Sequence, residues 1–83
     1  MIEYKFDTQL LIEGKNLSED EISDYIEKNI PGDCLLVTGD ESVIKLHFHT
    51  NIPWEVLRYC ASLGEIHDII VENMYLQSEG YHR

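Results

Sequence analysis

The chain has 83 residues, with 16 Asp and Glu against 6 Lys and Arg, so its formal net charge is −10. This length predicts one domain with a modest core. The acidic balance would repel phosphate backbones and argues against a nucleic-acid partner. The chain has no apolar run near the roughly 20 residues that span a bilayer and no signal-peptide pattern at its start, so we expect no membrane association and a cytoplasmic location.

The first half of the chain predicts a strand followed by a helix. Polar and apolar residues alternate over residues 4–13, which is typical of a half-buried strand. Ser18 and Glu21 then form a capping box, the signature of a helix start. Apolar residues recur at helical spacing after this box, and Pro31-Gly32 ends the helix.

The second half predicts a hairpin, a second helix and a last strand. Residues 34–37 and 42–49 are strand-like, and the short turn between them indicates a hairpin. An apolar stripe at helical spacing follows, and the last strand is expected over residues 66–74. We expect Ile69 and Val71 to be the core pair of this strand.

The element order is β-α-β-β-α-β, which predicts an α+β, ferredoxin-like fold. In this fold a four-stranded antiparallel sheet carries both helices on one face. We expect a single α+β domain over residues 1–76 and a polar C-terminal tail over residues 77–83. Because the apolar side chains of the strands must face the helices, the other face of the sheet is expected to be open.

Two histidines near the end of the third strand are the main candidate for a functional site. His47 and His49 are two residues apart on a strand, so their side chains point to the same face. The usual strand order of this fold, 4-1-3-2, brings the start of strand 1 beside them and therefore predicts Asp7 as a neighbour. Two imidazoles and a carboxylate suit zinc or another borderline divalent metal. Gln9 or Glu72 would stand in second rank.

Alternative interpretations of this cluster stay open. The three side chains could form only a hydrogen-bonded polar cluster, or the open sheet face could be buried in a homodimer. A metal-bound water would make a small enzyme, but the sequence offers no Gly-rich phosphate loop and no serine with a positioned base. We therefore expect no catalytic residues. Cys34 and Cys60 are expected to be packed thiols, and His67 a surface histidine far from the pair.

Four stretches of the sequence form a recognisable combination. They are Phe6-Asp7-Thr8-Gln9-Leu10, then Gly32-Asp33-Cys34-Leu35-Leu36-Val37 with Gly39-Asp40, then Val43 to Thr50 with Asn51 and Pro53, and finally Leu63-Gly64-Glu65 with Ile69, Val71, Glu72, Asn73 and Met74. In this combination the chain resembles the middle domain of the bacterial fatty acid kinase catalytic subunit, in the dihydroxyacetone-kinase-like family. The resemblance covers most of residues 4–76.

The resemblance implies a stand-alone copy of a non-catalytic accessory or interaction module. It implies association with itself, as a homodimer, or with a kinase-domain protein. The family's cysteine and two histidines, thought to form a metal site, map onto Asp7, His47 and His49. Carboxylate is a harder ligand than thiolate, so the site could hold zinc more weakly, hold another divalent metal, or hold none. A purely structural oligomerisation module is the alternative function.

Overall fold

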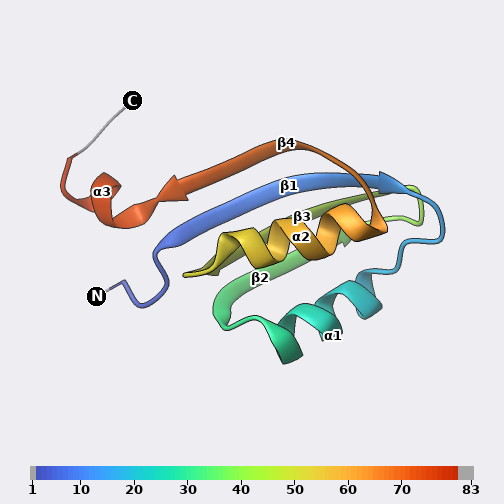
Figure 1. The fold of residues 1–83 in the computed structure, drawn as a ribbon, viewed down its shortest axis with the longest axis horizontal. Helices are drawn as coiled ribbons and strands as arrows, with labels where there is room; N and C mark the ends of the chain where they lie inside the picture. Colours follow the sequence, from blue (N-terminus) through green and yellow to red (C-terminus); the bar gives the residue numbers. More distant parts are fainter. Residues whose placement is uncertain (1, 81–83) are drawn as a thin grey trace.

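The computed structural model describes residues 2–80. Its elements in chain order are β1 (Phe6–Gly14), α1 (Glu19–Asn29), β2 (Gly32–Gly39), β3 (Val43–Thr50), α2 (Pro53–Leu63), β4 (Gly64–Asn73) and α3 (Met74–Ser78). The strands form one antiparallel sheet in the order β2-β3-β1-β4 (Figure 1). The predicted α+β arrangement, with a four-stranded antiparallel sheet and two main helices, is confirmed.

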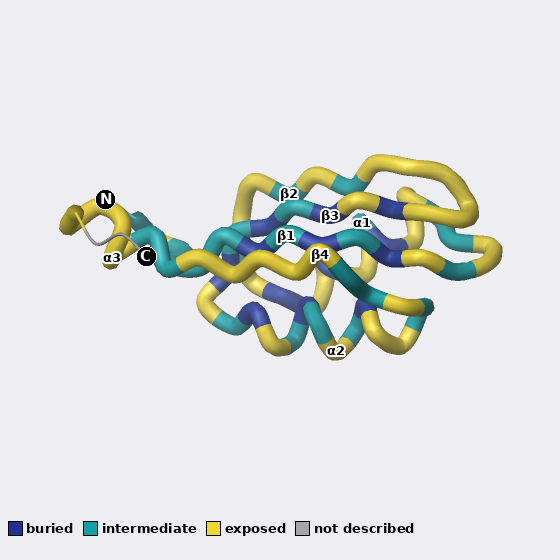
Figure 2. Tube along the Cα trace, turned by 90° about the horizontal axis from the view of Figure 1, so that it is seen from above, coloured by how far each residue is buried: buried dark blue, intermediate teal, exposed yellow. Residues whose placement is uncertain are grey.

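The core lies between one face of the sheet and the helices α1 and α2. Alternate residues of the two central strands, β1 and β3, point into this layer, and Figure 2 shows the buried positions along them. The buried apolar side chains are Leu10, Ile12, Ile22, Ile26, Ile30, Ile44, Leu46, Phe48, Val56 and Cys60. Because one parity of each central strand supplies all the strand members of this cluster, the opposite sheet face is left open.

Local signals explain where the helices begin and how they meet. The Ser18 hydroxyl accepts a hydrogen bond from the Glu21 backbone N–H at 3.2 Å, as the capping box predicts. The helix α2 starts at Pro53 without a side-chain cap. The rings of Tyr25 on α1 and Tyr59 on α2 stack with centroids 3.7 Å apart, which joins the two helices outside the core.

Both edge strands of the sheet are irregular. The register of β2 against β3 shifts between Asp33 and Leu36, where Cys34 has a φ of 56°. The register of β4 against β1 also shifts, next to Asp68 with a φ of 52°. Positive φ is uncommon for residues other than glycine and here accompanies a bulge. Bulged edges are poor templates for pairing with a further strand, and they redirect the side chains at the bulge.

The last strand differs from the prediction. The expectation that Ile69 and Val71 form a core pair is wrong, since they are 45% and 38% exposed. No residue of β4, which is described along its whole length, is buried. The reason is the position of β4 at the edge of the sheet, where β1 covers it on one side only.

A short helix, α3, follows β4 where the sequence suggested the end of a strand and a polar tail. The side-chain oxygen of Asn73 accepts a hydrogen bond from the Leu76 backbone N–H at 3.1 Å and caps this helix. The helix includes Gln77 and Ser78. The rest of the expected tail lies partly outside the described residues, His82 included.

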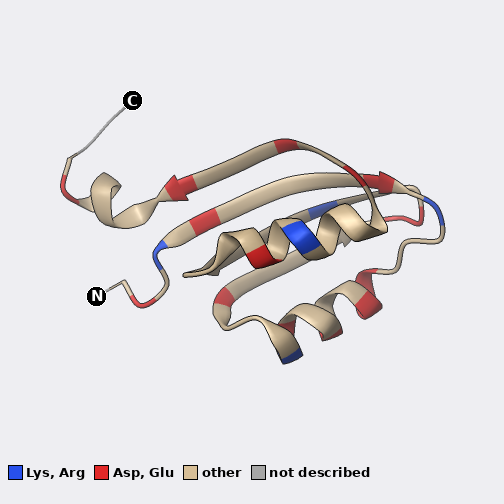
Figure 3. Ribbon diagram, viewed as in Figure 1, with Lys and Arg blue, Asp and Glu red and all other residues tan. Residues whose placement is uncertain are grey.

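Acidic side chains are spread over much of the molecule. Figure 3 shows them on α1 and on the strands β1, β2 and β4, with few Lys or Arg between them. Of the helices in residues 2–80, none combines the length and the apolar character that crossing a membrane requires. The charge distribution favours cations near the sheet.

We predict that Leu46→Ala lowers the free energy of unfolding by about 2–5 kcal/mol, because Leu46 is fully buried between the sheet and the helices. Its matched control is Leu36→Ala on β2, where the side chain is 59% exposed and the change should stay within about 0.5 kcal/mol. Urea unfolding followed by circular dichroism measures both. Equal destabilisation by the two substitutions would contradict the placement of the core.

Candidate metal-binding site

The pairing of β1 with β3 brings the three predicted ligands together on the open face of the sheet. Asp7 lies directly opposite His49, and Gln9 lies directly opposite His47. Side chains opposite one another in an antiparallel pair have Cβ atoms roughly 4.5–5.5 Å apart. One potential ligand atom from each of Asp7, His47 and His49 lies within 4.8 Å of the other two. The structure therefore places these residues as a cluster, half-buried at the ends of two central strands.

The distances within the cluster are short. The Nε2 atoms of His47 and His49 are 3.0 Å apart. The Asp7 Oδ1 atom lies 3.6 Å from Nε2 of His47 and 3.8 Å from Nε2 of His49. Two facing Nε2 atoms at this separation cannot both carry a hydrogen. Either one ring donates to the other, or both lone pairs point toward a shared cation.

This geometry matches the donor set of a tetrahedral metal ion. Zinc binds imidazole nitrogen and carboxylate oxygen at about 2.0–2.2 Å, so two such ligands at the tetrahedral angle lie roughly 3.3–3.6 Å apart. The three separations in the cluster, 3.0, 3.6 and 3.8 Å, bracket that range. The residues present therefore fit a divalent ion with only small side-chain movements.

Neighbouring side chains orient the ligands from both sides. The Gln9 amide donates to Oδ1 and Oδ2 of Asp7, each at 3.4 Å, and so fixes the carboxylate. On the other side of the His49 ring, Nδ1 lies 3.7 Å from Oδ1 of Asp33. Metal-binding histidines commonly turn their second nitrogen toward a carboxylate, which sets the tautomer. Glu72, also predicted in second rank, lies opposite Asp7 on β4 and is exposed.

Two residues of the cluster were missed by the sequence reasoning. Asp33 lies opposite His49 on β2, and Cys34 follows it at the bulge. Ligand atoms of Asp33, Cys34 and His49 also lie within 4.8 Å of one another. The predicted hairpin contained a usable signal, because the start of β2 must lie beside the end of β3. The bulge itself leaves no recognisable pattern in the sequence.

The two cysteines have opposite environments. Cys34 is exposed, so the expectation that it is a packed thiol is wrong, and its position at the bulge is the reason. Partial loss of hydration raises the pKa of Cys34, and the charge and hydrogen bond of Asp33 and the charge of Asp7 raise it further. Cys60 is buried in the core as expected, and burial raises the pKa of its thiol to about 12. Both thiols are free.

The fourth strand holds a separate histidine pair. His67 lies opposite Leu11, toward the end of β1 that is remote from Asp7, as periodicity predicts. Its Nε2 atom lies 2.6 Å from Oε2 of Glu13. His67 therefore has a carboxylate partner of its own and provides a natural control for experiments on His47.

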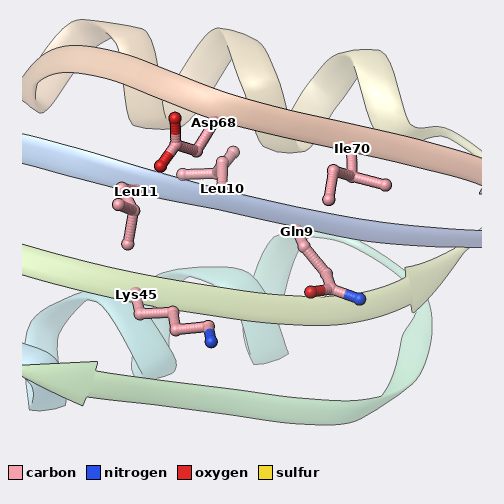
Figure 4. A pocket seen from close by; sticks show the side chains of 6 residues that line it. All are labelled: Gln9, Leu10, Leu11, Lys45, Asp68 and Ile70. Carbon is pink, nitrogen blue, oxygen red and sulfur yellow. The ribbon is translucent and has the colours of Figure 1, made fainter.

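An open hollow adjoins the cluster on the same face of the sheet (Figure 4). Its volume is about 180 Å³, below the roughly 300–1,000 Å³ of typical small-molecule sites. The side chain of Gln9 connects the two features, because it lines the hollow and holds Asp7. The residues that line the hollow are Gln9, Leu10, Leu11, Lys45, Asp68 and Ile70.

Comparison with known proteins gives a consistent match over nearly the whole chain. Residues 3–81 match the family model of the middle domain of FakA-like fatty acid kinase subunits. An uncharacterised protein of Staphylococcus haemolyticus is 36% identical over 75 residues, which is 88% of this chain and 14% of that protein. An uncharacterised protein of Staphylococcus aureus strain USA300 is 37% identical over 73 residues, 86% of this chain and 13% of that protein. The chain thus spans a small part of the relatives that it matches.

We predict that a thiol reagent labels Cys34 in the native protein and labels Cys60 only after unfolding. The thiolate is the reacting species, and Cys60 is both inaccessible and shifted to a pKa of about 12. Mass spectrometry of protein labelled in the presence of a metal chelator, with and without denaturant, measures the two sites. Rapid labelling of both cysteines in the native state would show that the core around Cys60 is not closed.

Proposed function

Because this chain belongs to the family of FakA-like fatty acid kinase middle domains, we propose that it is an accessory module that binds one divalent metal ion and interacts with another protein chain, without catalysis of its own. The observation that carries the metal half is the pair of Nε2 atoms of His47 and His49, 3.0 Å apart and both facing Asp7. The family match supports the role of a module rather than of a complete enzyme.

The ion in this proposal is zinc or another borderline divalent metal. Asp7 from β1 and the two histidines from β3 would hold it, so that it links the two central strands across the open face. Two nitrogens and one oxygen favour such ions over very soft ones. Three protein ligands leave a position free for water or for a partner side chain.

The partner in this proposal is a second copy of the chain or a kinase-domain protein. The open face carries three exposed apolar side chains, Leu36, Val43 and Ile70, on three different strands around the polar cluster. Apolar side chains around polar groups are common at protein interfaces. The relatives are much longer than this chain, so the corresponding module in them lies among other parts of the protein. The acidic surface supports the expectation of no nucleic-acid or membrane partner.

The same apolar side chains support the second candidate function, a structural oligomerisation module. In that case the open face is buried in a homodimer and the histidines are polar members of the interface. The two candidates differ in whether metal binding depends on His47.

We predict that His47→Ala weakens zinc binding at least tenfold, because it removes one of three ligands, whereas His67→Ala leaves the affinity unchanged. Competition with a chromophoric chelator, using protein without a polyhistidine tag, measures the affinity. The His67 control has the same residue type on the same sheet. Equal zinc affinities for wild type and His47→Ala would exclude the proposed metal site.

We predict that the chain forms a dimer at high concentration and that Ile70→Glu shifts it toward the monomer, because a carboxylate replaces an exposed apolar side chain on the open face. Light scattering after size-exclusion chromatography measures the mass. Trp54→Glu is the control, since Trp54 is exposed on α2 at the other side of the molecule. A wild-type monomer at high concentration, or dissociation by the Trp54 substitution alone, would contradict a dimer through the open face.

A further inference from the structure

We propose that His49 also serves a second cation position, on the side of its ring away from His47, where Asp33 and Cys34 are the other ligands and the ion is thiophilic. The proposal rests on the proposed function in one respect, namely that it shares His49 with the first ligand set. It adds a thiolate and a different ion preference to the same corner of the sheet.

The His49 ring lies between two sets of ligands. Its Nε2 atom faces Asp7 and His47, at 3.8 and 3.0 Å. Its Nδ1 atom lies 3.7 Å from Oδ1 of Asp33. Ligand atoms of Asp33, Cys34 and His49 lie within 4.8 Å of one another, a set separate from that of Asp7 and His47. Each ring nitrogen therefore has its own pair of neighbouring ligands.

The bulge in β2 explains how a cysteine reaches this position. Asp33 lies opposite His49, but the next residue of β2 that lies opposite a histidine is Leu36, beside His47. An unbulged pair would need only one residue between those two positions, and β2 has two. Cys34 is one of them, with a φ of 56°, and it is exposed next to His49 rather than packed in the core.

The chemistry of the two ligand sets differs. Asp7, His47 and His49 offer only oxygen and nitrogen, whereas Cys34 adds a sulfur that prefers soft ions such as cadmium. A neutral imidazole has one nitrogen with a lone pair and one that carries hydrogen. His49 can therefore bind an ion through only one nitrogen at a time, while the other nitrogen faces a carboxylate, Asp7 or Asp33. The two positions exclude each other, and the softness of the ion selects between them.

Cadmium NMR of the reduced full chain tests this inference, with Cd²⁺ alone as the probe. Wild type is expected to give one signal shifted downfield by sulfur ligation, at one cadmium per chain. Cys34→Ser is expected to lose the sulfur shift, with an unchanged circular dichroism spectrum because the side chain is exposed. His47→Ala should keep the shift, since the second position does not use His47. Cys60→Ser is the matched cysteine control and should also keep it.

Two results would overturn the inference. A cadmium signal without a sulfur shift in wild type, or the same signal in wild type and Cys34→Ser, would show that Cys34 is not a ligand. Loss of the shift in His47→Ala would show that Cys34 and His47 bind the same ion and that there is no separate position. The proposed function fails by a different measurement, an unchanged zinc affinity in His47→Ala, so the two failures are distinguishable.

Discussion

The antiparallel register between β1 and β3 is the constraint on which the rest of the structure depends. It sets Asp7 opposite His49 and, three residues along, Leu10 opposite Leu46. Because side chains alternate between the faces, a slip of one residue would expose the core side chains and bury the polar ones. Burial of Leu10 and Leu46 under the helices thus holds the ligands in place on the other face. Hydrophobic packing fixes the geometry of a polar site that lies outside the core.

That geometry concentrates carboxylates around one imidazole. His49 lies between Asp7 on β1 and Asp33 on β2, and Asp7 is held in turn by Gln9. The chain as a whole carries a formal net charge of −10, which adds a general attraction for cations. Local ligand placement and overall charge therefore act in the same direction. The open face above the cluster leaves room for a partner to approach, with the exposed side chain of Leu36 close by on β2.

The parts of this arrangement that follow from periodicity were predictable from the sequence. Alternation gave the core face of β1 and β3, and the strand order of the fold gave the proximity of Asp7 to the histidines. The parts that depend on the sheet edges were not. Cys34 leaves the expected packing because a single extra residue forms a bulge, and Val71 is exposed because an edge strand has a neighbour on one side only. Neither effect changes the hydrophobic pattern along the chain.

The most direct test of the central claim is an anomalous difference map from a zinc-soaked crystal of the chain, recorded at the zinc absorption edge. The register of β1 and β3 predicts the strongest peak on the open face, about 2.0–2.2 Å from Nε2 of His47 and from a carboxylate oxygen of Asp7. A strongest peak that touches neither residue, for example one beside His67 and Glu13 at the other end of the sheet, would contradict the account.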